Sequence, residues 1–77
     1  MHGPIPTQAG DVLILSKTGT TILVVGVVSA DGGQAMSAMH ELFSTIADAM
    51  RRAANLAKRS HRIYLKDTVS GEWSQVN

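Results

Sequence analysis

The side chains of this chain that could carry chemistry are dispersed along it. His2, His40 and His61 lie far apart and show no paired spacing of the kind that holds a metal ion. The chain has no cysteine, which excludes disulfide bonds, thiolate zinc sites and thiol redox chemistry. The six carboxylates also lack the spacing of a metal-binding loop; they are Asp11, Asp31, Glu41, Asp48, Asp67 and Glu72.

The sequence offers no nucleophile in a setting that would activate it. Ser60 precedes His61, but neighbours in sequence generally point apart, and a nucleophile must lie within hydrogen-bond reach of its base. The turn at residues 31–33 leads toward helix-forming residues but lacks the G-x-x-x-x-G-K pattern of a phosphate-binding loop. A chain of 77 residues also has little room for a well-walled pocket. We therefore predict that this protein is not an enzyme and uses no cofactor or metal.

The basic residues are clustered. Six of the seven lysines and arginines lie between residues 51 and 66, a window without an acidic residue. With Tyr64 on the same side of a strand as Arg62 and Lys66, this region could bind phosphates and stack a base. Alternatively, the basic residues suit a helix C-terminus and their stems cover apolar edges. The net charge of +1 argues against a dedicated nucleic-acid binder. The candidate nucleic-acid patch, not favoured, is Arg51, Arg52, Lys58, Arg59, Arg62 and Tyr64.

A single amphipathic helix is predicted over residues 45–59, where apolar residues recur at three- and four-residue steps. Its start stays open between Thr45 and Ala35. Met36 and Met39 continue the apolar face upstream, whereas Thr45 with Asp48 makes a variant of the capping box. A helix that began near Ala35 would be too long for the sheet beneath it.

Extended segments flank this helix on both sides. The predicted strands are residues 11–17, 21–29, 61–66 and 72–76, with turns at 17–20 and 67–71. Residues 1–10, rich in glycine and proline, are predicted to form a flexible arm. Residues 11–77 then form one α+β domain in the order β-β-α-β-β. We expect an antiparallel-rich, four-stranded sheet with the helix packed on one face.

The first two strands do not alternate between apolar and polar residues. The runs at residues 12–15 and 22–25 are apolar throughout, so both faces of this hairpin require burial, and one helix covers only one face. We interpret the second face as the contact with another subunit or a partner protein. The candidate partner or dimer face is Val12, Ile14, Leu23, Val25, Val27, Met36 and Met39.

The second half of the chain resembles a known group. Residues 43–57 (F-S-T-I-A-D-A-M-R-R-A-A-N-L-A) are followed by R-I-Y-L-K-D-T-V-S-G-E-W-S-Q-V at 62–76. Over about residues 43–76 this pattern resembles small bacterial β-β-α-β-β proteins of uncharacterised function. They share the phenylalanine before the helix, an A-x-x-x-A-x-x-L-A-like helix and a D-x-x-x-G-x-W-like turn. The resemblance implies the same order of elements and no particular activity.

These observations together predict a non-catalytic interaction or regulatory module that forms a homodimer or homo-oligomer or binds an unknown protein partner. The alternative is weak nucleic-acid binding. The longest apolar run, residues 22–28, is far shorter than the roughly 20 residues that span a bilayer. The N-terminus lacks the basic start and apolar run of a signal peptide. We expect no membrane association and a cytoplasmic, bacterial protein.

Overall fold

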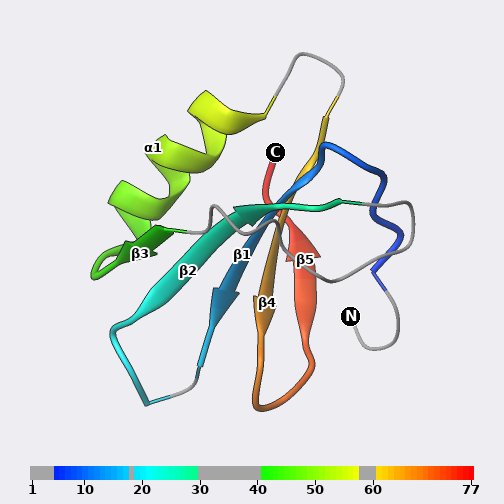
Figure 1. The fold of residues 1–77 in the computed structure, drawn as a ribbon. Helices are drawn as coiled ribbons and strands as arrows, with labels where there is room; N and C mark the ends of the chain where they lie inside the picture. The colour runs from blue at the N-terminus through cyan, green and yellow to red at the C-terminus, as the bar shows by residue number, and fades with distance from the viewer. Residues whose placement is uncertain (1–4, 18, 30–40, 58–60) are drawn as a thin grey trace.

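The computed structural model describes residues 5–17, 19–29, 41–57 and 61–77 of the chain. The elements in these residues are β1 (Val12–Ser16), β2 (Leu23–Val27), β3 (Glu41–Phe43), α1 (Ile46–Leu56), β4 (Ile63–Asp67) and β5 (Trp73–Gln75). The strands form one mixed sheet in the order β3-β2-β1-β4-β5. β1 and β4 are parallel, and the other neighbouring pairs are antiparallel. α1 packs against one face of this sheet (Figure 1), so the predicted α+β class is confirmed.

The sheet has one strand more than predicted. β3 lies in the stretch that the sequence left undecided before the helix, and it pairs with β2 so that Leu42 lies opposite Val24. A helix running from Ala35 through this stretch is therefore wrong, since the chain is extended at Glu41–Phe43. Met36 and Met39 lie outside the described residues.

α1 begins where the capping residues predict. The Thr45 hydroxyl accepts a hydrogen bond from the backbone N–H of Asp48 at 3.2 Å, which satisfies one of the free donors of the first turn. The helix ends at Leu56, and Ala57 caps it by donating its N–H to the carbonyl of Ala53 at 2.8 Å. Eleven residues of helix span about 16 Å, close to the roughly 17 Å of a five-residue strand. The helix therefore fits the sheet without overhang.

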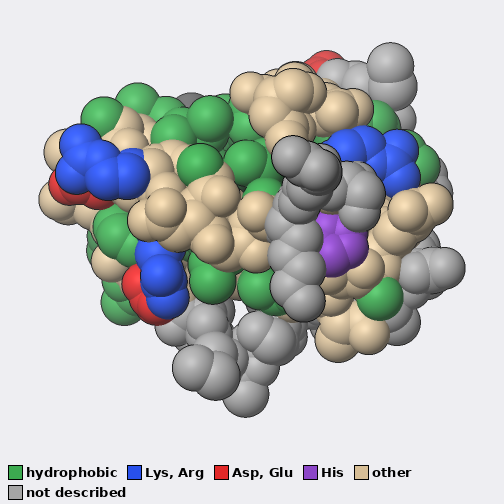
Figure 2. All heavy atoms as spheres, turned by 90° about the horizontal axis from the view of Figure 1, so that it is seen from above, with side chains coloured by type: hydrophobic (Ala, Val, Ile, Leu, Met, Phe, Trp, Pro, Cys, Tyr) green, Lys and Arg blue, Asp and Glu red, His purple; other side chains and the backbone are tan. Residues whose placement is uncertain are grey.

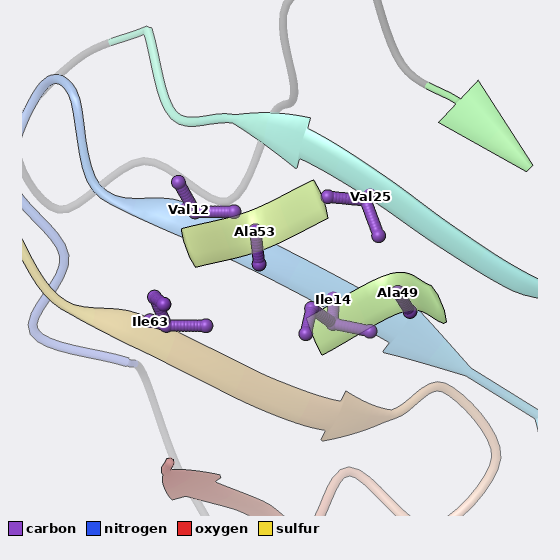
Figure 3. Packing of buried hydrophobic residues seen from close by; sticks show 6 residues of the cluster. All are labelled: Val12, Ile14, Val25, Ala49, Ala53 and Ile63. Carbon is purple, nitrogen blue, oxygen red and sulfur yellow. The ribbon is translucent and has the colours of Figure 1, made fainter. Parts of the chain in front are cut away.

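One core lies between α1 and the sheet. Its buried members are Val12, Ile14, Val25, Ala49, Ala53 and Ile63 (Figure 3). Ala49 and Ala53 face the branched side chains of the strands, and because they are small they let the helix approach the sheet closely. Leu65 also packs here, so Ile63 and Leu65 of β4 share the face that meets α1.

A second core lies on the opposite face of the sheet. Its buried members are Ile5, Leu13, Val28 and Tyr64. A flexible arm was predicted for residues 1–10, but Ile5 and Thr7 are buried, which adds residues 5–10 to the packed domain. The central strand β1 is therefore covered on both faces at its first three residues. This burial explains why its sequence does not alternate.

Trp73 belongs to the second core as a packing residue. Its ring packs against the buried cluster and meets the Tyr64 ring edge to face, with centroids 5.6 Å apart and planes at 74°. The predicted turn before β5 is also present, because Gly71 donates its N–H to the Asp67 carbonyl at 2.9 Å. The β4–β5 hairpin thus holds the two aromatic rings together.

Candidate interaction surface

The second face of the sheet is covered only in part by the described residues. Ile5 and Thr7 lie over the end where β1 begins. Toward the other end, Leu15, Ile22 and Val24 line a hollow of about 390 Å³, whose remaining lining comes from Ser16, Lys17, Thr20 and Thr68. The β1–β2 loop and the β4–β5 turn lie together at this end of the sheet (Figure 1). The hollow is therefore apolar at its floor and polar at its rim.

The strand register extends this apolar area to the edge of the sheet. Leu15 lies opposite Val24, and Val24 lies opposite Leu42, so the three side chains form one row across β1, β2 and β3. Leu42 is 66% exposed and Ile22 is 58% exposed. We call these four residues, Leu15, Ile22, Val24 and Leu42, the open apolar surface. Within this set Ile22 and Leu42 are exposed, whereas Leu15 and Val24 are half-buried.

The partner face predicted from sequence lies on the side of the hairpin that α1 covers, opposite the open apolar surface. Val12, Ile14 and Val25 are fully buried beneath α1, and they are not accessible to a partner. Leu23 packs against the same core. Val27 lies opposite Val12 in the ladder and so shares that face. Of the two sides of the hairpin, the alternate residues Leu15, Ile22 and Val24 are the ones left open.

The arginines of the basic cluster that lie on α1 are each paired with an acid. Arg52 makes a bidentate contact with Glu41, with hydrogen bonds of 2.8 to 3.1 Å to both carboxylate oxygens. Arg51 lies 3.6 Å from Asp48, three residues before it on α1. Figure 2 shows the basic side chains of one face in separate groups, two of which touch acidic side chains. The helix therefore does not present a continuous basic patch on that face.

The remaining described members of the predicted patch, Arg62 and Tyr64, do not form the base-stacking site that the sequence suggested. Arg62 lies over the Tyr64 ring, 5.9 Å from its centroid, and its Nε lies 3.8 Å from Asp11. Tyr64 is only 1% exposed, so its ring is not open to a stacking base. Lys58 and Arg59 lie outside the described residues.

Replacing Arg52 with alanine is expected to lower the free energy of unfolding by only about 0.5–1 kcal/mol, because the pair with Glu41 is partly solvated. A loss of that size corresponds to about 3–6 °C in the midpoint of thermal unfolding for a domain of this length. Circular dichroism during heating measures it. A shift well above 10 °C would mean that the pair holds β3 in the sheet.

Asp11 carries a buried carboxylate that joins three segments. Its two oxygens accept hydrogen bonds from the backbone N–H of Gln8 at 2.8 Å and of Arg62 at 3.0 Å. Its own carbonyl accepts the N–H of Val28 at 2.8 Å. The carboxylate is thus occupied by backbone donors, and its position is that of a structural clamp between the N-terminal segment and β4.

The described residues contain no cluster of three side chains able to hold a metal ion. Within the same residues, no helix has the length and apolar character needed to cross a membrane. Comparisons with protein-family models, curated proteins and solved structures found no match to this chain. The resemblance of residues 43–76 to small bacterial proteins therefore stays a prediction.

Proposed function

We propose that this domain is a non-catalytic interaction module that self-associates through the open apolar surface. The observation that supports the proposal is the exposure of Leu42 and Ile22 beside an apolar hollow on a sheet face that the described residues cover only in part. Burial of apolar surface contributes about 25 cal/mol per Å². A partner that covers this surface would gain that free energy.

A second copy of the chain is the partner that we propose. A domain of 77 residues has a small core, and domains of this size are commonly reinforced by oligomerisation. The chain has no cysteine for a disulfide, which removes one alternative route to reinforcement. Its formal net charge of +1 also leaves little repulsion between two copies.

The test is the mass in solution across a concentration series, measured by sedimentation or light scattering. We expect a dimer that dissociates on dilution. Leu42→Asp should weaken the dimer by about tenfold or more, since a charge would be buried without a partner at the contact. Because Leu42 is largely exposed in the protomer, the variant should keep its circular dichroism spectrum.

Val69→Asp is the matched control. Val69 is 63% exposed, nearly the same as Leu42, but it lies in the β4–β5 turn and is not part of the open apolar surface. This variant should dimerise like the unchanged protein. A monomer at every concentration would overturn the proposed self-association. Equal dimerisation of both variants would overturn the assignment of the surface.

A further inference from the structure

We infer that two copies join edge to edge, by antiparallel pairing of β3 with β3 of the second copy. The inference rests on the proposed self-association and specifies its geometry. β3 ends the sheet within the part of the chain that the structure describes. An edge strand presents backbone N–H and C=O groups that another extended strand can bind, so its chemistry selects a β-strand as partner.

β3 is short, which limits pairing at an edge, but its own residues include few of the other devices that keep an edge strand from pairing. Its three residues include no proline and no lysine. Its one charged residue, Glu41, is held by the guanidinium of Arg52 from α1, which offsets part of the carboxylate's charge at this edge. The side chain that β3 exposes most is the apolar Leu42. Within the described residues, the edge is therefore short but holds no proline and no lysine.

The opposite edge of the sheet differs in character. β5 exposes Ser74 and Gln75, and its one large apolar side chain, Trp73, is packed on the second core. The Gln75 side chain also donates to the carbonyl of Asn77 at 3.0 Å. Polar residues at β5 and apolar ones at β3 make β3 the edge that gains from being covered.

The positions of the exposed apolar residues favour an edge contact over the stacking of two sheet faces. Leu42 and Ile22 lie on the open side of the sheet. Ile46, which is 48% exposed, lies four residues after Leu42 in the first turn of α1, and α1 covers the other side. Exposed apolar residues thus lie near β3 on both sides of the sheet. A strand added at this edge lies between them, whereas a stacked sheet reaches only one side.

The exposed apolar residue of β3 favours one register of the pairing. A two-fold axis at the middle residue places Leu42 opposite Leu42 of the second copy and Glu41 opposite its Phe43. A shift that sets Glu41 opposite Glu41 moves the two exposed Leu42 side chains apart and leaves them uncovered. The favoured register therefore makes a Leu42–Leu42 contact at the centre of the dimer and continues the sheet across it.

A single cysteine tests this geometry, because the chain has none of its own. Directly opposed residues of antiparallel strands have Cα atoms about 4.5–5.5 Å apart, within the range of about 4.4–6.8 Å that a disulfide spans. Leu42→Cys should therefore form a disulfide-linked dimer under mild oxidation, measured on a non-reducing gel. We expect a rate about tenfold or more above that of the exposed control Val69→Cys, because the dimer holds the two Leu42→Cys thiols at a high effective concentration.

Hydrogen exchange of the unchanged protein gives a second readout. Edge pairing should slow the exchange of backbone amides in Glu41–Phe43 at concentrations where the dimer forms. A dimer that cross-links at Ile22→Cys and not at Leu42→Cys would overturn edge pairing and leave self-association standing. If the β3 amides exchanged at the same rate in the dimer as in the monomer, edge pairing would likewise be overturned. A chain that stays monomeric would overturn both proposals.

Discussion

Replacing Gly10 with alanine is expected to destabilise the domain by about 3 kcal/mol, through backbone strain and a steric clash together. Gly10 has a φ of +96°, a conformation that residues with a Cβ rarely adopt. A Cβ added there would lie 2.4 Å from Cε1 and 2.6 Å from Nε2 of His61. The His61 ring must move, and its Nδ1 atom is already buried with no hydrogen-bond partner among the described residues. Urea unfolding followed by circular dichroism measures the loss.

Gly19→Ala separates the two causes. Gly19 has a similar φ of +85°, but an added Cβ meets nothing within 4 Å. It should cost only the backbone strain, about 1–2 kcal/mol. The double variant Gly10→Ala/His61→Ala has no ring for the new Cβ to meet. Compared with His61→Ala alone, it should therefore lose about as much stability as Gly19→Ala loses in the unchanged protein. If Gly10→Ala and Gly19→Ala proved equally mild, the His61 ring would not pack on Gly10 in solution.

The contrast between these two glycines shows which backbone conformations a local sequence pattern predicts. Gly19 lies between two apolar runs, and a turn there with a positive φ follows from local rules, as the structure confirms. Gly10 lies in a segment whose composition predicts a flexible arm, yet its conformation depends on a ring 51 positions later in the chain. No local sequence pattern predicts a contact between residues so far apart in the chain.

The same distinction applies to the elements. The helix and both hairpins follow from periodicity and capping residues, although the helix was predicted over residues 45–59 and ends at Leu56. β3 was missed because Glu41–Phe43 is only three residues long, and residues such as leucine and glutamate favour helices. Its pairing with β2 overrides that preference. The central place of β1, with β4 parallel beside it, likewise arises from long-range pairing.

The sequence predicted that the hairpin has two apolar faces but not which of them is open. The apolar runs in β1 and β2 correctly indicate that both faces of the sheet carry apolar residues. They do not indicate which alternate residues face α1, because residues of both sets are apolar. The set that contains Val12 and Ile14 lies under the helix, and the other contains Leu13 and Leu15. Leu13 is fully buried in the second core and Leu15 only partly, a difference that only tertiary packing decides.

Asp11→Ala is expected to lower the free energy of unfolding by about 3 kcal/mol, because it leaves the N–H groups of Gln8 and Arg62 without their acceptor. It also removes the acid near the Arg62 guanidinium. Asp11→Asn should recover only part of the loss, since an amide has one acceptor oxygen and its NH₂ group would face a donor. Chemical denaturation of the three proteins measures the series.

The control for Asp11 is Asp48→Ala. Asp48 also lies near an arginine, Arg51, but its side chain is half exposed and its pair is 3.6 Å long. Its removal should cost about 0.5 kcal/mol. If both substitutions cost the same, the Asp11 carboxylate would be solvated and would not clamp the chain.

Trp73 allows the Asp11 clamp to be followed locally. It is the only tryptophan, and it packs on the core that Ile5 covers. If Asp11 holds the N-terminal segment on the sheet, Asp11→Ala should shift the Trp73 emission to longer wavelength while the circular dichroism spectrum is still that of the folded domain. Asp48→Ala should leave the emission unchanged.

Release of the N-terminal segment in Asp11→Ala would also expose Leu13, which adjoins the open apolar surface. Asp11→Ala should then associate more strongly than the unchanged protein. A variant that unfolds in one step, with both signals changing together, would show that the N-terminal segment and the sheet form a single cooperative unit.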